Sequence, residues 1–240
     1  MKLGIVGGLG PESTVDYYQS LVARYRERVR DGSYPRVIIN CVDLKRVVDG
    51  ITGSDLADVT ECLVDAVEAL ARAGADFGLI AANTPHIVFD DVQLRSPIPL
   101  ISIVEAACDG AKAAGLTRIG IFGTRFTMNG RFYTDVFDRA GIALVMPDPD
   151  DQDWIHKRYL GELVEGVFKP ETREGLLDIV DRLRTRKGID GLLLAGTELP
   201  LILRMESYDE IPFLDTTRIH VERAIDEMLR ELSVTGSSAR

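Results

Sequence analysis

The chain has 240 residues, 45% hydrophobic and 28% charged, a length that suits one large α/β domain or two lobes of about 100–120 residues each. Its 38 acidic and 28 basic residues give a net charge of −10, which argues against nucleic-acid and anionic-membrane partners. No apolar run reaches the roughly 20 residues that span a bilayer. Neither a secretory signal nor a disulfide framework is recognisable, so we expect a cytoplasmic, soluble protein.

Strand-like and helix-like segments alternate along the first half of the chain. Buried strands are predicted at 2–7, 37–39, 77–82 and 99–103. A helix begins near Pro11, because proline fits the first helical turn. Further helices are predicted at 56–70, ended by Gly74, and at 104–114.

The second half repeats this alternation. Strands are predicted at 118–122, 143–146, 191–195 and 213–214, and helices near 130–140, 151–166, 171–186 and 218–232. The tail 233–240 is expected to fray. Alternating strands and helices predict an α/β fold with parallel sheets and helices on both faces.

Three segments recur in the same order. Residues 4–8 resemble 120–124, residues 74–84 resemble 188–198, and residues 98–100 resemble 211–213, at offsets of 116, 114 and 113 residues. This repeat predicts two similar lobes related by a pseudo-twofold axis, with strand ends facing a shared ligand-binding cleft. We expect lobe 1 to comprise 1–103 and 216–240, and lobe 2 to comprise 104–215.

Five motifs carry a resemblance to a known family. They are GIVGGLGPEST at 4–14, ANTPH at 82–86, GTRFTM with FY at 123–133, GTEL at 196–199 and DTTRIH at 215–220. With them, nearly the whole chain resembles the aspartate/glutamate racemase family of cofactor-independent amino-acid racemases. The resemblance implies a homodimeric isomerase that acts on a small acidic amino acid or related carboxylate, with neither PLP nor metal.

The sequence departs from the family at both catalytic thiols. The resemblance places a thiol at position 82 and another at 196, one for each face of the substrate's α-carbon, but the chain has Ala82 and Gly196. Neither side chain has an ionisable proton, so the two-thiol mechanism of racemisation cannot operate. Cys41, His86 and Glu198 are candidate substitutes. Their alternative interpretations are a buried inert cysteine, a structural histidine and a residue that orients the substrate amine.

Polar residues near the predicted strand ends are candidate substrate-binding groups. Each hydroxyl has the alternative role of capping a helix. Arg46 and Lys169 are candidate clamps for a side-chain carboxylate, and a solvated surface charge is an equal alternative for both. The full candidate set is Gly8, Ser13, Thr14, Arg46, Asn83, Thr84, Thr124, Thr127, Lys169, Thr197 and Glu198.

The glycine loop does not predict a dinucleotide site, because Gly7, Gly8 and Gly10 lack the GxGxxG spacing. No metal-ligand cluster is recognisable either. Three hypotheses therefore stand. The protein is a racemase homologue with substitute acid–base groups, a diverged decarboxylase, isomerase or lyase on the same scaffold, or a non-catalytic carboxylate-binding protein.

Overall fold

The computed structural model describes residues 1–235, and the chain divides into two compact units. Unit 1 is Met1–Ile103 with His220–Arg240, and unit 2 is Val104–Ile219. The second boundary therefore lies four residues beyond the expected one at 215/216, inside helix α11 (Thr216–Thr235). Residues 216–219 stay with unit 2 because the Thr216 hydroxyl donates to the Leu194 carbonyl over 2.8 Å and Ile219 packs against Gly110.

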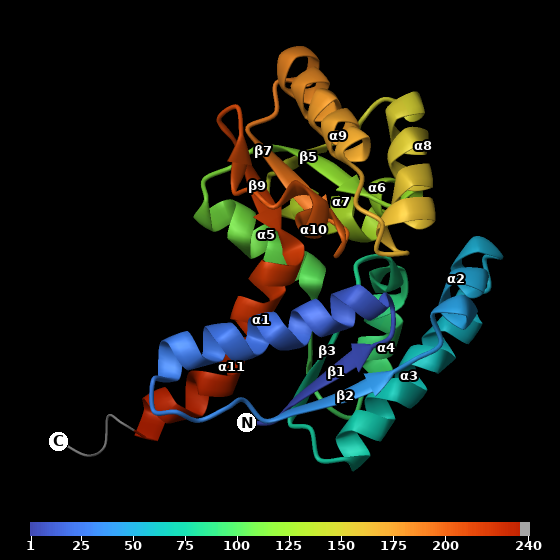
Figure 1. The fold of residues 1–240 in the computed structure, drawn as a ribbon. Coiled ribbons are helices and arrows are strands. Elements are labelled where there is room, and N and C mark those ends of the chain that lie inside the picture. Colours follow the sequence, from blue (N-terminus) through green and yellow to red (C-terminus); the bar gives the residue numbers. More distant parts are fainter. Residues whose placement is uncertain (236–240) are drawn as a thin grey trace. The chain divides into compact units, whose positions relative to one another are not determined.

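Unit 1 is built on a four-stranded parallel sheet in the order β2-β1-β3-β4 (Figure 1). The strands are β1 (Leu3–Gly7), β2 (Val37–Cys41), β3 (Phe77–Ile80) and β4 (Leu100–Ile101). β1 and β3 are fully buried, as strands covered on both faces are. The prediction of a buried strand at 37–39 is wrong about burial, because β2 is an edge strand and Ile39 is 39% exposed.

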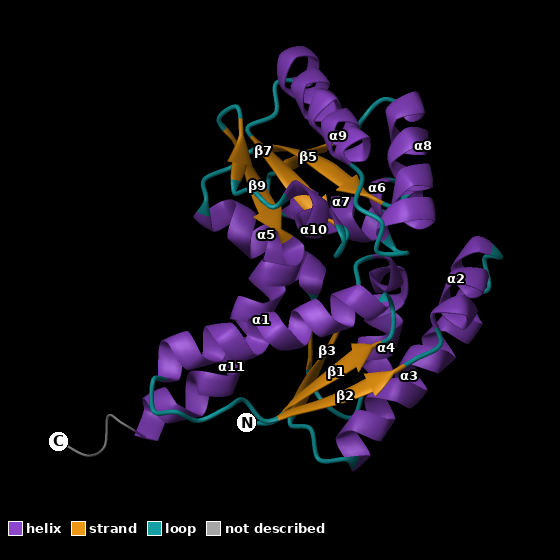
Figure 2. Cartoon of the chain, in the orientation of Figure 1, coloured by secondary structure: helices purple, strands orange, loops and turns teal. Residues whose placement is uncertain are grey.

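Helices cover both faces of this sheet (Figure 2). On one face, α1 (Pro11–Val29) and α11 contribute Tyr17, Leu21 and Ile225 to a core with β1 and β3. On the other face lies α3 (Leu56–Arg72), which approaches closely because Gly4 has no side chain to meet Leu70. The remaining elements are α2 (Leu44–Thr52), the 3-10 turn η1 (Thr84–Val88) and α4 (Phe89–Arg95).

His220, to which the sequence assigned no task, is a structural residue of unit 1. Its Nδ1 is hydrogen-bonded to the Tyr17 hydroxyl at 2.9 Å, and its Nε2 to the Ile101 carbonyl at 2.9 Å. It therefore joins α11 to α1 and β4. Burial holds the pKa of His220 at about 4, so the ring is neutral at pH 7.

Unit 2 repeats the sheet order of unit 1. Its parallel strands follow the order β6-β5-β7-β9, and the two-residue strand β8 (Ser207–Tyr208) pairs antiparallel to β9. These strands are β5 (Arg118–Gly123), β6 (Ala143–Val145), β7 (Gly191–Ala195) and β9 (Ile211–Asp215). The three repeated sequence segments thus become equivalent strands, β1 with β5, β3 with β7 and β4 with β9.

The helices of unit 2 differ most from expectation where α-helices run into π-helical turns. The expected helix at 151–166 is α8 (Pro149–Arg158) followed by the π-helical turn η2 (Tyr159–Leu163). The helix expected at 171–186 is α9 (Pro170–Arg182) followed by the π-helical turn η3 (Leu183–Lys187). The others are α5 (Ile103–Ala113), α6 (Arg125–Met128), α7 (Arg131–Arg139) and α10 (Leu199–Leu203).

Other deviations concern the ends of elements and short helices. β3 ends at Ile80 rather than 82, and β4 keeps only two residues of the five expected at 99–103. The short helices α2, α4, α6 and α10 were not predicted. α11 continues to Thr235, past the expected end at 232, and the expected fraying of 236–240 lies outside the described residues. Within residues 1–235, the structure has no helix with the length and apolarity to cross a bilayer.

Candidate functional site

The glycine loop of unit 1 lies at the carboxyl end of β1 and leads into α1. Gly8 has a φ of 77°, a backbone conformation that glycine adopts freely. Its N–H donates to Thr14 Oγ1 over 2.9 Å, and the same hydroxyl donates to the Gly10 carbonyl over 3.2 Å. Ser13, the residue before Thr14, is also buried. Gly10 is the N-cap of α1, so neither Ser13 nor Thr14 has the capping role that was the alternative for both.

At the carboxyl end of β3, the residues present no titratable group with a free lone pair. Ala82 and Asn83 are buried, and Thr84 begins η1. His86 Nε2 accepts the Ile103 N–H at 3.2 Å, so its Nδ1–H donates to the Ala82 carbonyl at 2.9 Å. Burial, together with the nearby ring of His220, holds the pKa of His86 at about 3. The structural interpretation of His86 therefore fits better than a general base.

Among the cysteines, the structure separates Cys41 from the other two. Cys62 and Cys108 are buried, and burial raises the pKa of both thiols. Cys41 is exposed at the end of β2, beside Gly8, whose ideal Cβ would lie 3.0 Å from the Cys41 Cβ. The alternative of a buried Cys41 is thus wrong about its burial.

At the carboxyl end of β5 in unit 2, a threonine pair begins helix α6. Thr124 is the N-cap, and its Oγ1 accepts the Thr127 N–H at 3.2 Å. The two hydroxyls are also 3.2 Å apart, and both residues are buried. For Thr124 the capping role is therefore present, and it holds both hydroxyls in place at the strand end.

At the carboxyl end of β7, an aromatic ring occupies the space beside Gly196. An ideal Cβ built on Gly196 would lie 2.5 Å from Tyr159 Cε2 and 2.8 Å from the Tyr159 hydroxyl oxygen. Real Cβ atoms do not approach other atoms this closely, so a side chain at position 196 would require the Tyr159 ring to shift. Tyr159 is the first residue of η2, a segment for which the sequence predicts a continuous helix.

The ring is held by a buried polar cluster. The Tyr159 hydroxyl donates to Glu198 Oε2, and the Thr197 hydroxyl donates to the same carboxylate oxygen over 3.0 Å. Tyr159, Thr197 and Glu198 are each no more than 6% exposed. Burial, and then the negative charge of Glu198, raise the pKa of Tyr159 well above its ordinary value. The phenol therefore keeps its proton at neutral pH and donates it in the hydrogen bond to Glu198.

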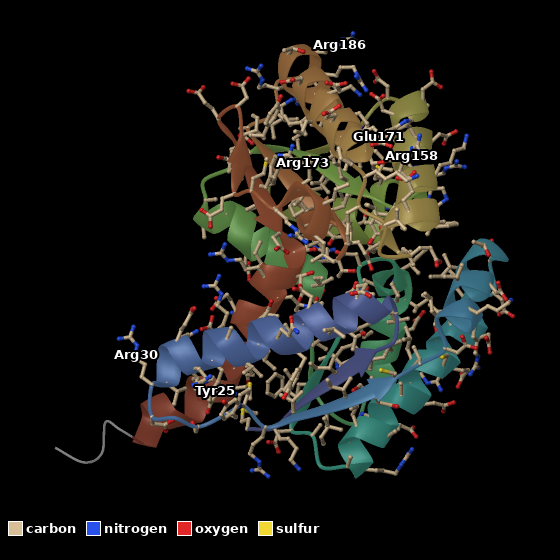
Figure 3. The ribbon with its side chains drawn as sticks, viewed as in Figure 1. Tyr25, Arg30, Arg158, Glu171, Arg173 and Arg186 are labelled. Carbon is tan, nitrogen blue, oxygen red and sulfur yellow. The ribbon has the colours of Figure 1, made fainter. Side chains whose placement is uncertain are left out.

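A second buried carboxylate, Glu162, anchors η2. It accepts hydrogen bonds from Thr172 Oγ1 at 2.5 Å, from Lys169 Nζ at 3.0 Å and from Arg158. Arg158 is the last residue of α8 and is labelled in Figure 3. The Thr172 hydroxyl, followed by the Lys169 ammonium and the Arg158 guanidinium, holds the pKa of Glu162 at about 2. Lys169, a candidate substrate clamp with a surface charge as the equal alternative, is thus a partly exposed partner of Glu162 within unit 2.

The other expected clamp, Arg46, is a surface residue of α2. Its Nε and Nη2 donate to the two carboxylate oxygens of Asp58 at 3.0 and 2.5 Å, and both side chains are about 40% exposed. This bidentate pair raises the pKa of Arg46 above its ordinary value. Of the two interpretations open for Arg46, the surface charge is the one that this geometry favours.

The end of β9 supplies two groups that sequence analysis did not single out. Burial raises the pKa of Asp215, which lies opposite Leu194 of β7 in the sheet register. Thr217 Oγ1 is buried and is one of two such side-chain atoms in the described residues without a hydrogen-bond partner. Both lie in the DTTRIH motif, and that motif is the sequence feature that could have singled them out. Groups of three metal-ligating residues are absent from the part of the chain that the structure describes.

Comparison with known proteins places this chain in a family. The family model described as Asp/Glu/Hydantoin racemase matches residues 6–224. The chain belongs to this family. A curated relative, the broad-specificity amino-acid racemase RacX of Bacillus subtilis (strain 168), is 23% identical over 224 residues, which is 90% of this chain and 92% of RacX.

Solved structures from the family share the fold. A candidate Asp/Glu racemase from Yersinia pestis has 28% sequence identity and a TM-score of 0.86, and the match covers 95% of this chain and 100% of that one. An aspartate racemase homologue from Pyrococcus horikoshii OT3 has 32% identity and a TM-score of 0.79, covering 95% and 98% of the two chains. The predicted α/β fold with parallel, helix-flanked sheets is confirmed.

Proposed function

We propose that this protein binds a small acidic amino acid or a related small carboxylate and acts on its α-carbon without PLP. The observation that carries the proposal is the family match over residues 6–224. Relatives named as racemases of amino acids, and of aspartate in particular, support this class of ligand.

The polar groups of unit 2 suit such a ligand. The Thr217 hydroxyl is buried without a partner, although an unsatisfied buried hydroxyl costs about 1–3 kcal/mol, so a ligand that bonds it recovers that cost. Thr197 and Glu198 lie at the neighbouring strand end, where a carboxylate side chain can accept from a substrate amine.

A second candidate, a decarboxylase or lyase on the same scaffold, is favoured by one observation. Ala82 has no ionisable group, and the nearby His86 has both ring nitrogens bonded to backbone. A reaction that needs a single proton-carrying group tolerates this arrangement better than racemisation, which needs one on each face of the carbon.

Calorimetric titration with L- and D-aspartate, L- and D-glutamate, and lysine tests the proposal. We expect at least one acidic amino acid to bind and lysine not to bind. Thr217→Val should weaken that binding about fivefold, the loss of about one hydrogen bond. The control is Thr185→Val, which removes an exposed hydroxyl of η3 that bonds the Asp181 carbonyl at 2.7 Å. Absence of binding by all four acidic amino acids would contradict the proposal.

Proton NMR in D₂O then separates an enzyme from a binding protein. Solvent deuterium at the α-carbon of a bound amino acid identifies proton transfer, a new product identifies the decarboxylase or lyase, and binding without either identifies a non-catalytic homologue. The homodimer implied by the resemblance is part of the proposal, and sedimentation equilibrium tests it.

A further inference from the structure

We propose that Tyr159, hydrogen-bonded to Glu198, is the proton-transfer group of unit 2 and stands in for the thiol that the family's motif has at position 196. The inference rests on the proposed function and deepens it, because it names the group that moves the proton. It depends on three observations, which are the space beside Gly196, the turn that places the ring there and the hydrogen bond to Glu198.

The first observation is steric. An ideal Cβ at position 196 would lie 2.8 Å from the Tyr159 hydroxyl oxygen and 2.9 Å from Tyr159 Cζ. The phenol therefore fills the space next to the backbone from which a cysteine side chain would extend. A glycine at 196 and a tyrosine at 159 are complementary, because a side chain at 196 would displace the ring from this position.

The second observation is the local backbone. Tyr159 is the first residue of a π-helical turn that interrupts the path of α8, and such turns are often found at functional sites. The turn is anchored by Glu162, which bonds Thr172 at 2.5 Å, Lys169 at 3.0 Å and also Arg158. The ring is thus placed by a part of the fold that is fixed independently of Glu198.

The third observation is the hydrogen bonding of the phenol. Its hydroxyl donates to Glu198 Oε2, and the Thr197 hydroxyl reaches the same oxygen at 3.0 Å. The hydroxyl proton of Tyr159 therefore lies between the phenol oxygen and Glu198 Oε2. Burial and the Glu198 charge raise the pKa of Tyr159, so the phenol keeps its proton at neutral pH until it passes it on.

The proton movement balances without any other reactant. As the substrate's α C–H bond breaks, its proton forms a new O–H bond on Tyr159, and the proton already on Tyr159 moves to Glu198. The electron pair of the C–H bond stays on the substrate as an enediolate. The pair changes from a charge of −1 to neutral, and the reverse movement returns a proton to the carbon.

Tyr159→Phe tests this step because it removes only the hydroxyl and leaves the ring in its space. The matched control is Tyr208→Phe, which removes the hydroxyl of another tyrosine–carboxylate pair in unit 2, bonded to Asp181 Oδ2 at 3.3 Å. The probes are L- and D-aspartate and L- and D-glutamate. α-Proton exchange in D₂O is followed by NMR, and affinity is followed by calorimetry on the same samples.

We expect Tyr159→Phe to slow α-proton exchange at least about a hundredfold, the size of one acid–base contribution, and to leave the affinity of the probe nearly unchanged. Tyr208→Phe should leave both unchanged. A spectroscopic readout checks the pairing with Glu198. With ¹³C-labelled tyrosine, Glu198→Gln should lower the pKa of Tyr159 because it removes the negative charge that opposes ionisation.

The outcomes distinguish the two proposals. Exchange that survives in Tyr159→Phe overturns the role of Tyr159 and leaves the proposed function standing. Binding without exchange in the unmodified protein also overturns the role of Tyr159, and it leaves only the binding part of the proposed function. An unchanged Tyr159 titration in Glu198→Gln also overturns it. If none of the four amino acids binds, the proposed function fails, and the inference fails with it.

Discussion

The two units use one sheet order but finish their equivalent strands with different chemistry. After β3, unit 1 has Ala82 and a neutral histidine whose ring nitrogens both bond the backbone. After β7, unit 2 has Gly196 and a phenol whose hydroxyl donates to Glu198. A repeated scaffold thus fixes where a strand ends, while single side chains decide whether that end can move a proton.

The buried ionisable groups differ in the same way. Unit 1 buries His86 and His220 as neutral rings, whereas unit 2 buries Glu162 as a charged carboxylate with two cations and a hydroxyl around it. The two units should therefore respond differently to acid, to added side-chain volume and to the loss of one hydroxyl.

The largest expected difference is in acid stability. Unfolded histidine has an ordinary pKa of 6.5, but folded His86 and His220 titrate near 3 and 4. The unfolded state therefore binds more protons below pH 6.5, and unit 1 loses stability as the pH falls from there toward 4. At pH 5 the loss is about 2 kcal/mol for each histidine.

Unit 2 should withstand the same change better. Glu162 has an ordinary pKa of 4.5 and a folded value of about 2, so its contribution is present above pH 4.5 and is lost only as the pH falls toward 2. The histidine of unit 2, His156, is only partly buried, and burial lowers its pKa. Hydrogen exchange between pH 7 and 5, corrected for intrinsic rates, should accelerate in β1 and β3. Equal acceleration in β5 and β7 would contradict this account.

The next effect concerns the space beside Gly196. Gly196→Ala should destabilise the protein by about 1–3 kcal/mol, because the new methyl meets the Tyr159 ring. Gly161→Ala is the matched control in the same π-helical turn, where an ideal Cβ meets nothing within 4 Å. Urea denaturation measures both. If Gly196→Ala costs the same in a Tyr159→Leu background, the ring is not what excludes a side chain.

A smaller effect is expected from the anchor of η2. Thr172→Val removes a fully buried hydroxyl that bonds Glu162 at 2.5 Å, and it should cost about 1 kcal/mol. It should also raise the pKa of Glu162, because that hydroxyl is the strongest influence holding it low. Carboxyl ¹³C NMR follows the titration. A Glu162 pKa that stays near 2 in this variant would show that the cations alone set it.

The smallest effect is predicted for Arg46 in unit 1. Arg46→Ala breaks an exposed pair with Asp58 and should change stability by less than about 1 kcal/mol. Affinity for any acidic amino acid that binds should be unchanged, because the guanidinium is engaged at the surface. A tenfold loss of affinity in Arg46→Ala would contradict this and support a role for Arg46 in binding the substrate carboxylate.

Sequence predicted the sheets well because buried parallel strands are short apolar runs, and residues 74–84 and 188–198 repeat closely enough to place β3 and β7. It also pointed to Glu198 and Gly196. It missed Tyr159, since one aromatic residue in an expected helix at 151–166 has the pattern of core packing. The π-helical turn leaves no mark in the periodicity of the sequence.

The sequence also did not predict which side chains pair with each other. Lys169 with Glu162 and Arg46 with Asp58 are pairs set by tertiary contacts, which spacing along the chain does not reveal. The exposure of Cys41 follows from β2 lying at the sheet edge, a position decided by strand order. Each of these cases needed the fold before a role for the residue could be assessed.

The central claim is that Tyr159 at the end of β7 is a proton-transfer group and that Ala82 and His86 after β3 supply no counterpart. The two enantiomers of the bound amino acid test it most directly. In D₂O, each enantiomer is incubated separately, and deuterium at the α-carbon and the opposite enantiomer are measured together. The account predicts that one enantiomer exchanges its α-proton with retention and little conversion. Equal exchange from both enantiomers, with conversion keeping pace, would show a proton carrier on each face and contradict it.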